Sequence, residues 1–119
     1  MIINISNIDI LEKANFKDLK ELGLSKNKIS DIKVLEKIKF NKLEILYLSE
    51  NNISNIDILE KVNFKDLKKL NLSENKISDI KVLEKVKFEK LELLDLRNNK
   101  IDVNNYNLII SKMKSILKI

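Results

Sequence analysis

The apolar residues of this chain recur at one constant interval. Leu22, Leu46, Leu70 and Leu94 form one column of this repeat. The other columns are Leu19, Leu43, Leu67 and Leu91; Leu24, Leu48, Leu72 and Leu96; Ile29, Ile53, Ile77 and Ile101; Phe16, Phe40, Phe64 and Phe88; and the polar Asn27, Asn51, Asn75 and Asn99. Such a period is typical of solenoids, in which each unit buries its apolar side against its neighbours. The pattern predicts one domain of four repeats, about 5–28, 29–52, 53–76 and 77–100, followed by a cap at about 102–119.

Each unit reads Leu-x-x-Leu-x-Leu-x-x-Asn-x-Ile, as in residues 67–77. Leu70 and Leu72 are two positions apart, so they point to the same side of a short strand, into the core, while residue 71 points outward. The asparagine follows at the place where the chain must leave the strand. We expect its amide to donate to and accept from backbone groups of adjacent coils, because turn peptides lack sheet partners.

The second part of each unit predicts a short helix on the outer side of the solenoid. Leu35 and Ile38 are three positions apart, and Ser30 or Asp31 is available as the N-cap. The four phenylalanines are expected to stack beneath this outer side. Capping boxes are predicted in the alternate units, at Ser6 to Asp9 and at Ser54 to Asp57.

The repeated unit resembles the signature of the leucine-rich-repeat family. The run Asn-x-Ile-Ser-Asp-Ile, at Asn27 to Ile32 and Asn75 to Ile80, is similar to the repeats of internalin-like bacterial proteins and of the protein-phosphatase-regulator class. This resemblance implies an α/β leucine-rich-repeat solenoid with short parallel β-strands on a concave face, short helices on a convex face and a C-terminal capping helix. It does not identify a partner, because the architecture serves many unrelated ones.

A longer repeat, twice the length of one unit, is also present. Residues 5–52 and 53–100 align without a gap, with 37 identical pairs and 11 that differ. Ala14/Val62 and Ile38/Val86 are conservative changes at positions expected to point inward, and Asn41/Glu89 alters the outer surface. The remaining eight pairs lie on or just after the predicted strands, at 21/69, 23/71, 26/74, 45/93, 47/95, 49/97, 50/98 and 52/100.

This clustering favours recognition on the concave face. Drift of a duplicated surface would scatter over both faces, because surface substitutions usually cost less than about 0.5 kcal/mol. We expect an exposed apolar centre of Ile45, Tyr47 and Leu93, with charged side chains around it. The candidate partner-binding residues are Glu21, Ile45, Tyr47, Lys69, Asn71, Leu93, Asp95 and Arg97.

Composition narrows the chemistry of the chain. Its 119 residues include no Cys and no His, which excludes disulfides, thiolate nucleophiles, imidazole bases and Cys/His zinc sites. A single Gly excludes a glycine-rich phosphate loop, and no cluster of Asp or Glu interrupts the repeat. We therefore predict no catalytic residue, no metal site and no cofactor.

The net charge of +5 raises nucleic acid as a partner. However, most of the lysine excess lies on the predicted outer surface and near the C-terminus, and Tyr47 is the only aromatic residue on the strand side. Neither a phosphate-tracking stripe nor a base-stacking platform is predicted. A protein or peptide is the expected partner, rather than nucleic acid or membrane.

The two ends of the chain depart from the repeat. An amphipathic helix at about 104–118 is predicted to cover the last unit, although its lysines also permit a membrane-surface helix. At the other end, Met1 to Ile3 are a candidate cap, and an uncapped first strand would allow weak dimerisation of an otherwise monomeric chain. The helix prediction rests on three- and four-residue spacing of Val103, Tyr106, Ile110, Met113 and Leu117, with Ile109 and Ile116 alongside.

The sequence shows no signal-peptide pattern and no run of about 18 apolar residues, so we expect a soluble, cytoplasmic protein. The predicted function is that of a non-enzymatic protein-interaction module that binds its partner on the concave face. The alternative is a structural or assembly unit that associates through its solenoid ends and leaves the concave face unused.

Overall fold

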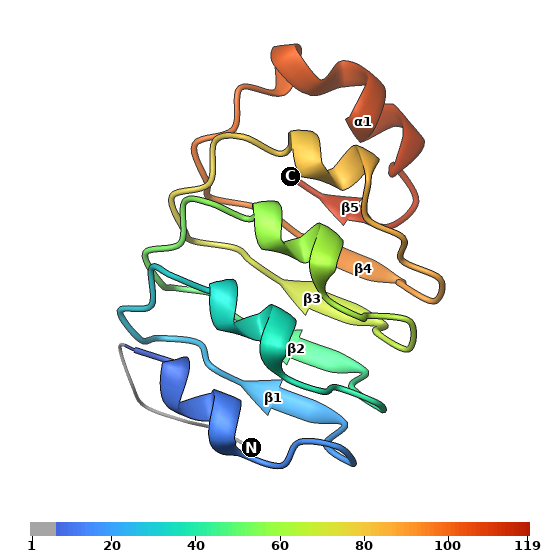
Figure 1. Ribbon diagram of the computed structural model, residues 1–119. Helices are drawn as coiled ribbons and strands as arrows, with labels where there is room; N and C mark the ends of the chain where they lie inside the picture. Colours follow the sequence, from blue (N-terminus) through green and yellow to red (C-terminus); the bar gives the residue numbers. More distant parts are fainter. Residues whose placement is uncertain (1–6) are drawn as a thin grey trace.

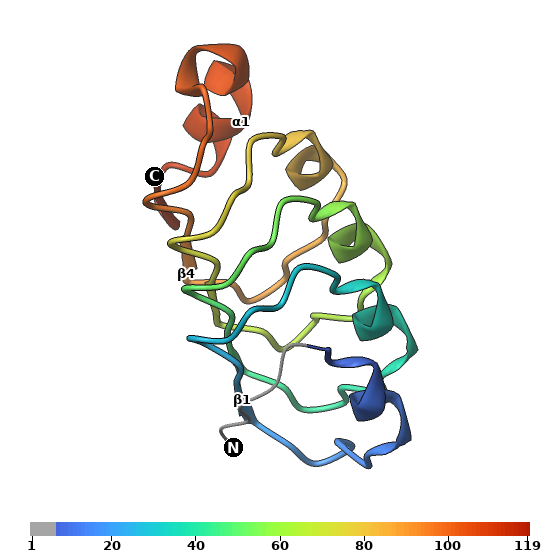
Figure 2. The same ribbon diagram turned by 90° about the vertical axis from the view of Figure 1, so that its left-hand side faces the viewer.

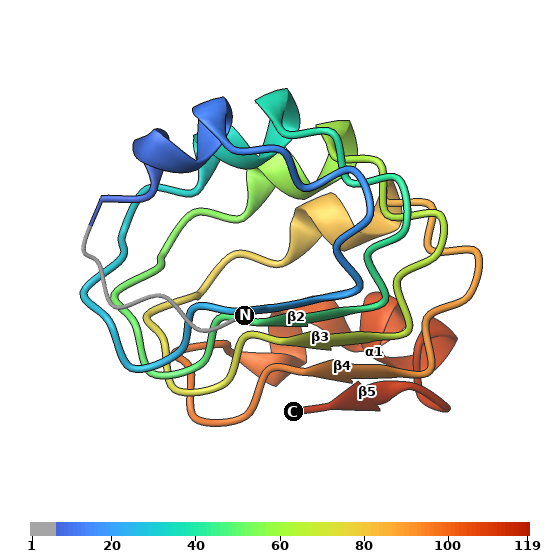
Figure 3. The ribbon, with the colours of Figure 1, turned by 90° about the horizontal axis from the view of Figure 1, so that it is seen from below.

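The computed structural model describes residues 7–119, which form four stacked coils and a C-terminal cap (Figure 1). Each coil has a three-residue strand on one side and a short 3₁₀ helix on the other, with the core between these two layers (Figure 3). The predicted solenoid of parallel strands and short outer helices is therefore confirmed. The strands are β1 (Glu21–Gly23), β2 (Ile45–Tyr47), β3 (Lys69–Asn71) and β4 (Leu93–Asp95), and the helices are η1 (Asp9–Lys13), η2 (Lys33–Lys37), η3 (Asp57–Lys61) and η4 (Lys81–Glu84).

The sheet is parallel, and its strands follow one another in chain order from β1 to β5. Its register pairs residues of the same repeat column, such as Leu22 with Leu46. Leu70 and Leu72 are fully buried, whereas Asn71 between them is half-buried on the outward side of the sheet. The alternation predicted from the Leu-x-Leu pattern is thus confirmed.

The outer helices are 3₁₀ helices rather than α-helices. In η2, the N–H of Leu35 donates to the carbonyl of Ile32 at 3.1 Å, and the N–H of Ile38 donates to that of Leu35 at 3.4 Å. These bonds span three residues, which places side chains three positions apart in one line. Ile32, Leu35 and Ile38 are all buried, so the apolar spacing of three in the sequence matches the helix that forms.

The entry to η2 differs in part from the prediction. Ile32 occupies the N-cap position and makes no side-chain capping bond. Asp31, one of the two predicted caps, still accepts a hydrogen bond from the N–H of Lys33 through Oδ1, at 2.9 Å. This is a local turn that spans two residues, and it leads the chain into the helix.

The predicted capping box at Ser54 and Asp57 is wrong. No side-chain capping bond forms at the start of η3. Instead, Oδ1 of Asn55 accepts a hydrogen bond from the N–H of Asp57 at 2.8 Å. An asparagine can close this turn with its own side chain over two residues, which competes directly with a longer helical cap. The equivalent box at Ser6 lies outside the described residues.

The asparagine column forms the predicted ladder between coils. Nδ2 of Asn75 donates to the carbonyl of Leu72 in its own coil at 3.1 Å and to that of Leu48 in the preceding coil at 2.9 Å. Its Oδ1 accepts from the N–H of Ile53 at 3.0 Å. Asn75 is 7% exposed, so these bonds satisfy buried turn peptides that have no sheet partner.

The phenylalanine column packs as two ring stacks. The ring centroids of Phe16 and Phe40 are 6.2 Å apart, and those of Phe64 and Phe88 are 6.5 Å apart, with nearly parallel planes in both pairs. These rings lie in the core together with the leucine and isoleucine columns. The stacking expected beneath the outer side is therefore present in pairs.

Successive coils also match in charge. Positions 18, 42, 66 and 90 are Asp, Lys, Asp and Lys, and positions 20, 44, 68 and 92 are Lys, Glu, Lys and Glu. These pairs are largely exposed, so each adds little to stability, but the alternation keeps like charges apart where coils stack. Ion pairs join Asp18 to Lys42 at 3.3 Å, Glu44 to Lys68 at 3.3 Å and Asp66 to Lys90 at 2.9 Å.

The C-terminal cap contains less helix and more strand than predicted. A short 3₁₀ helix, η5 (Val103–Tyr106), leads into α1 (Asn107–Lys112), and a turn then leads into β5 (Leu117–Lys118), which pairs with β4. The single helix predicted at 104–118 is therefore wrong in extent. Figure 2 shows α1 beyond the fourth coil, at the end of the stack.

The open edge of β4 explains this difference. The N–H groups of Leu94 and Leu96 donate to the carbonyls of Ile116 and Lys118 at 2.8 and 2.7 Å. A helix along this edge would leave both N–H groups without acceptors, because its own carbonyls are bonded internally. The strand therefore completes the sheet, while α1 covers the core.

The helix still performs the predicted capping. Ile109 is 5% exposed, and Ile110 and Met113 pack against the core. The hydroxyl of Tyr106 donates to Oδ1 of Asp79 at 3.2 Å. Val103, which the helical spacing placed on the apolar side, is instead 43% exposed. The candidate N-terminal cap, Met1 to Ile3, lies outside the described residues.

Candidate functional site

The concave face consists of the outward side chains of the five strands and of the residue that follows each of β1 to β4 by two positions. The register aligns these side chains in rows that cross the sheet, and strands in such a sheet lie about 4.8 Å apart. All eight candidate partner-binding residues lie on this face. The first row is Glu21, Ile45, Lys69 and Leu93; the second is Gly23, Tyr47, Asn71, Asp95 and Lys118; and the third is Ser25, Ser49, Ser73 and Arg97.

The apolar residues of this face do not form the single centre that was predicted. Lys69 pairs with Ile45 on one side and with Leu93 on the other. Ile45 and Tyr47 lie on β2 and Leu93 on β4, so about 10 Å, or two strand spacings, separates them. All three are half-buried rather than fully exposed. The face therefore has two small apolar areas with a lysine between them.

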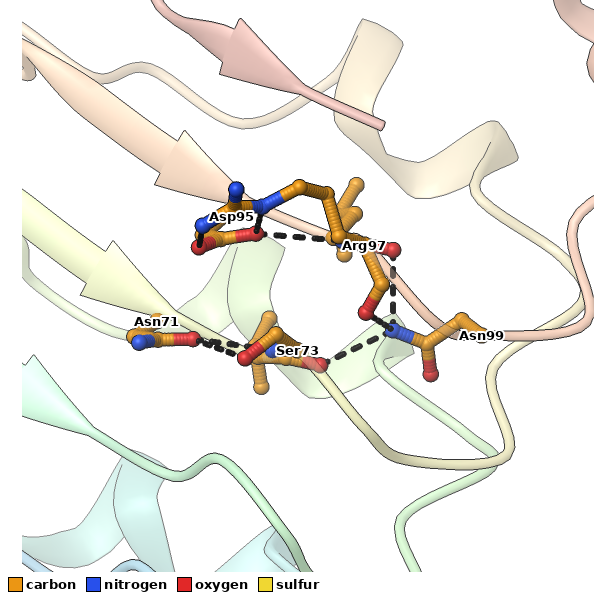
Figure 4. Close-up of polar contacts among 7 residues, drawn as sticks. Asn71, Ser73, Asp95, Arg97 and Asn99 are labelled. Carbon is orange, nitrogen blue, oxygen red and sulfur yellow. Dashed lines mark hydrogen bonds and ion pairs between the residues drawn. The ribbon is translucent and has the colours of Figure 1, made fainter.

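Asp95 is buried, at 4% exposed, although it occupies an outward position. Arg97 covers it with a bidentate contact: Nε donates to Oδ1 at 3.0 Å and Nη2 donates to Oδ2 at 2.7 Å (Figure 4). The backbone N–H of Arg97 also donates to Oδ1, at 3.1 Å. Asp95 thus holds Arg97 in place and is not the freely exposed contact that was expected.

The electrostatics of this pair follow from its hydrogen bonds. The side-chain hydrogen bond from Arg97 lowers the pKa of Asp95, and it outweighs the desolvation that would raise that pKa. The charge of Lys118 lowers the pKa of Asp95 further. The same bond raises the pKa of Arg97 above its already high usual value. Both groups are therefore charged at neutral pH.

Asn71 and Ser73 form the equivalent contact one strand earlier. Oδ1 of Asn71 accepts from the N–H of Ser73 at 2.9 Å and from its hydroxyl at 2.7 Å (Figure 4). On the first two coils, Oγ of Ser49 donates to Oγ of Ser25 at 2.9 Å. In the third and fourth coils, the polar residue at the end of the strand therefore holds the side chain that lies two positions later, so residues of the second and third rows are hydrogen-bonded to each other.

Lys118 is a member of this face that sequence reasoning missed. It pairs with Asp95 in the register of β4 and β5, and its side chain is exposed. A signal for it was present, since Leu117-Lys118-Ile119 repeats the pattern of Leu94-Asp95-Leu96. Leu117 follows Leu94 at a spacing one residue shorter than the repeat. Counting by the repeat length therefore does not place Lys118 in the column of Asp95.

Among residues 7–119, no group of three or more Asp and Glu side chains could hold a metal ion. A hollow of about 460 Å³ lies between the second and third coils on the outer side, and it opens to solvent. Its charged lining mixes lysines with carboxylates: Asp31, Lys33, Glu36, Asp57, Glu60 and Lys61. In the same part of the chain, no helix has the length and apolar character needed to cross a membrane.

Comparison with known proteins supports the repeat pattern. The family model described as leucine-rich repeats, in two copies, matches residues 41–85. An internalin (inlF) from Listeria monocytogenes is similar in structure, with a TM-score of 0.73 and 26% sequence identity. Internalin C2 from the same organism has a TM-score of 0.71 and 24% identity. No curated protein sequence matches the chain.

These similarities extend over almost the whole chain but only part of each internalin. The match covers 99% of this chain and 33% of the first internalin, and 97% of this chain and 47% of the second. The chain therefore spans less than half the length of either structure. The likeness concerns the solenoid architecture of the internalins and not the function of the whole proteins.

Proposed function

Because this chain is a leucine-rich-repeat solenoid, we propose that it binds a protein or peptide on its concave face. Leucine-rich repeats generally mediate protein–protein interaction, and this fold is generally a non-enzymatic scaffold. One architecture serves many partners, so the choice of face and of contact residues depends on features of this chain itself.

The observation that supports the concave face is the distribution of differences between the two halves of the chain. Helices η1 and η3 have the same sequence, and η2 matches residues 81–85. Four of the 11 differing pairs lie within the strands, and four follow in the turns after them. Ala14, expected to point inward, is exposed, so the outer surface differs at two pairs instead of one. The concentration on the strand side persists with that correction.

The size of the face also limits the partner. Five strands at about 4.8 Å give a strip on the order of 20 Å across, which suits a peptide, a loop or the edge of a small domain. Such an interface lies at the low end of usual sizes and depends on a few anchors. Tyr47 is the aromatic residue of this strip and is half-buried, which makes it the first candidate anchor.

The test compares two pairs of substitutions against a partner isolated with the full chain. The concave pair is Tyr47→Ala with Leu93→Ala, and the control pair is Lys37→Ala with Lys85→Ala on the outer face. Arg97 is left intact, because its removal would leave the buried carboxylate of Asp95 without its main partner. Weaker binding by the concave pair alone supports the proposal, and loss by the outer pair alone overturns it.

The same measurement addresses the alternative of an assembly unit. If the chain associates through its solenoid ends, light scattering will give a mass above that of one chain, and the concave pair of substitutions will leave this mass unchanged. A monomer whose partner is lost with the concave pair contradicts the assembly alternative.

A further inference from the structure

The end of the concave face at β4 and β5 is positively charged. Lys69, Arg97 and Lys118 lie in its three rows together with Asp95, and these four side chains carry a net positive charge. Glu74 lies in the turn after β3, where its backbone N–H donates to the carbonyl of Arg97. The charges of Asp95 and Arg97 largely cancel because the two side chains form an ion pair, so the excess positive charge comes from Lys69 and Lys118. The lysines on either side stay exposed, so this end attracts negative charge.

Arg97 is held in a position to bind an anion. Its contact with Asp95 uses Nε and Nη2, and Nη1 makes no hydrogen bond with any of residues 7–119. The side chain is 55% exposed, while that of Asp95 is 6% exposed. A guanidinium fixed in advance loses less conformational entropy on binding a carboxylate than a free one does.

An apolar side chain lies beside these cations. Leu93 precedes Asp95 by two positions on β4, so both point to the concave face. Lys69 is its partner in the register of β3 and β4. Leu93 is half-buried, which leaves surface for a contact with a ligand. Lys69 lies beside Leu93 in the first row, whereas Lys118 and Arg97 lie in the second and third rows. Three cations at one end of the face do not form the extended stripe that tracks a phosphate backbone.

Resting on the proposed function, we infer that this end of the concave face binds an acidic peptide segment. A carboxylate of the segment contacts Arg97 and Lys118, and a neighbouring apolar side chain contacts Leu93. Asn71 and Ser73 of the third coil correspond to Asp95 and Arg97 in the fourth, so a neutral pair is exchanged for an ion pair that presents an oriented guanidinium.

The experiment is selection of a random peptide library, displayed on phage, against the full immobilised chain. The selected peptides are then synthesised and titrated against Lys118→Gln, Tyr47→Ala and the control Lys112→Gln, an exposed lysine on α1. We expect peptides that combine Asp or Glu with apolar residues. Their affinity should fall about tenfold with Lys118→Gln and stay unchanged with Lys112→Gln, since one strong charged contact corresponds to about that factor. Circular dichroism confirms that each variant is folded.

The other outcomes separate this inference from the proposed function. Basic or neutral peptides that lose affinity with Tyr47→Ala but not with Lys118→Gln would overturn the acidic-segment inference and leave concave-face binding in place. Peptides insensitive to both variants, or no enrichment at all, would count against both. A single-stranded DNA oligonucleotide serves as the remaining probe. If it binds as tightly as the best peptide and is lost with Lys118→Gln, the ligand is a polyanion and the peptide inference fails.

Discussion

Nδ2 of Asn51, in the second coil, lies 3.0 Å from the carbonyl oxygen of Leu24 in the first. The Oδ1 of the same side chain accepts from the N–H of Ile29 at 3.1 Å, at the far end of the turn that follows β1. One buried side chain thus satisfies both an acceptor and a donor of this turn. The stack of coils depends on such contacts, because strands of three residues leave most turn peptides outside the sheet.

Replacing Asn51 by Ala should therefore lower the free energy of unfolding by about 1–3 kcal/mol, the cost of leaving buried backbone groups unsatisfied. Urea unfolding followed by circular dichroism measures this. Asn52→Ala is the matched control, because Asn52 is adjacent and exposed, and it should change stability by less than about 0.5 kcal/mol. An unchanged midpoint for Asn51→Ala would contradict a structural role for the ladder.

The turn after each strand offers a way to raise stability. Lys26, Glu50, Glu74 and Asn98 all have positive φ angles, between 54° and 60°, a left-handed region that Asn tolerates better than Glu or Lys. Glu50→Asn should therefore increase the free energy of unfolding by about 0.5 kcal/mol. Glu36→Asn, in η2 and without a positive φ angle, is the control and should give no increase. A lower thermal midpoint for Glu50→Asn would show that its side chain contributes more than its backbone strain costs.

The contact between Asp95 and Arg97 predicts a specific dependence on pH. Since Arg97 lowers the pKa of Asp95 from its ordinary value of 3.8, the folded state binds this proton less readily than the unfolded state does. The stabilisation is fully present above the ordinary pKa and is lost as the pH falls through the lowered one. Asp95→Asn should cost about 1–2 kcal/mol at pH 7, and this difference should shrink as the pH falls below about 4.

Urea unfolding of both proteins from pH 7 to pH 2 tests this dependence. Asp66→Asn is the comparison, because Asp66 also has a lowered pKa through its hydrogen bond to Lys90, but this pair lies at the surface and should contribute less. A gap between wild type and Asp95→Asn that stays constant over the whole range would mean that the carboxylate charge is not what stabilises the end of β4.

Removing the C-terminal cap should expose the last coil. Deletion of residues 104–119 uncovers the apolar layer beneath Ile109 and leaves the N–H groups of Leu94 and Leu96 without acceptors. We expect dye binding, aggregation or loss of cooperative unfolding. Deletion of residues 116–119 alone keeps α1 and removes β5, so it isolates the effect of the open edge, for which self-association is expected. A soluble, equally stable deletion of 104–119 that only loses binding to liposomes would favour the membrane-surface alternative.

The contribution of Tyr47 to the binding free energy can be predicted. Once a partner is identified, Tyr47→Ala should weaken binding by about 2 kcal/mol if the ring is an anchor. Tyr47→Phe keeps the ring and should change affinity by less than about 1 kcal/mol, whereas an equal loss would assign the contact to the hydroxyl. Folding should be little affected, because the interactions of β2 with β1 and β3 are made by its backbone. Isothermal titration calorimetry separates these cases.

The repeat spacing alone determined the architecture of this chain. A Leu-x-Leu pair that recurs at one fixed interval can bury its leucines only if successive copies stack in register, and that register fixes which residues share the outward rows. The spacing also determined the asparagine ladder, since a polar side chain that recurs at a buried turn must form hydrogen bonds with the backbone groups of the turns next to it. Both constraints recur once in every repeat, so the periodic pattern of the sequence contains them.

Only the tertiary structure decided what happens where the period ends and how far each outward side chain is exposed. The donors of Leu94 and Leu96 required acceptors from beyond the last repeat, so the chain forms β5 where helical spacing predicted continued helix. Ile45, Tyr47 and Leu93 became half-buried rather than fully exposed, because the exposure of each depends on the side chains beside it in the stacked rows. Asp95 was withdrawn from solvent by Arg97, a neighbour whose rotamer no spacing specifies. Edge hydrogen bonds and side-chain conformations depend on contacts with particular neighbours, and these contacts exist only once the coils are stacked.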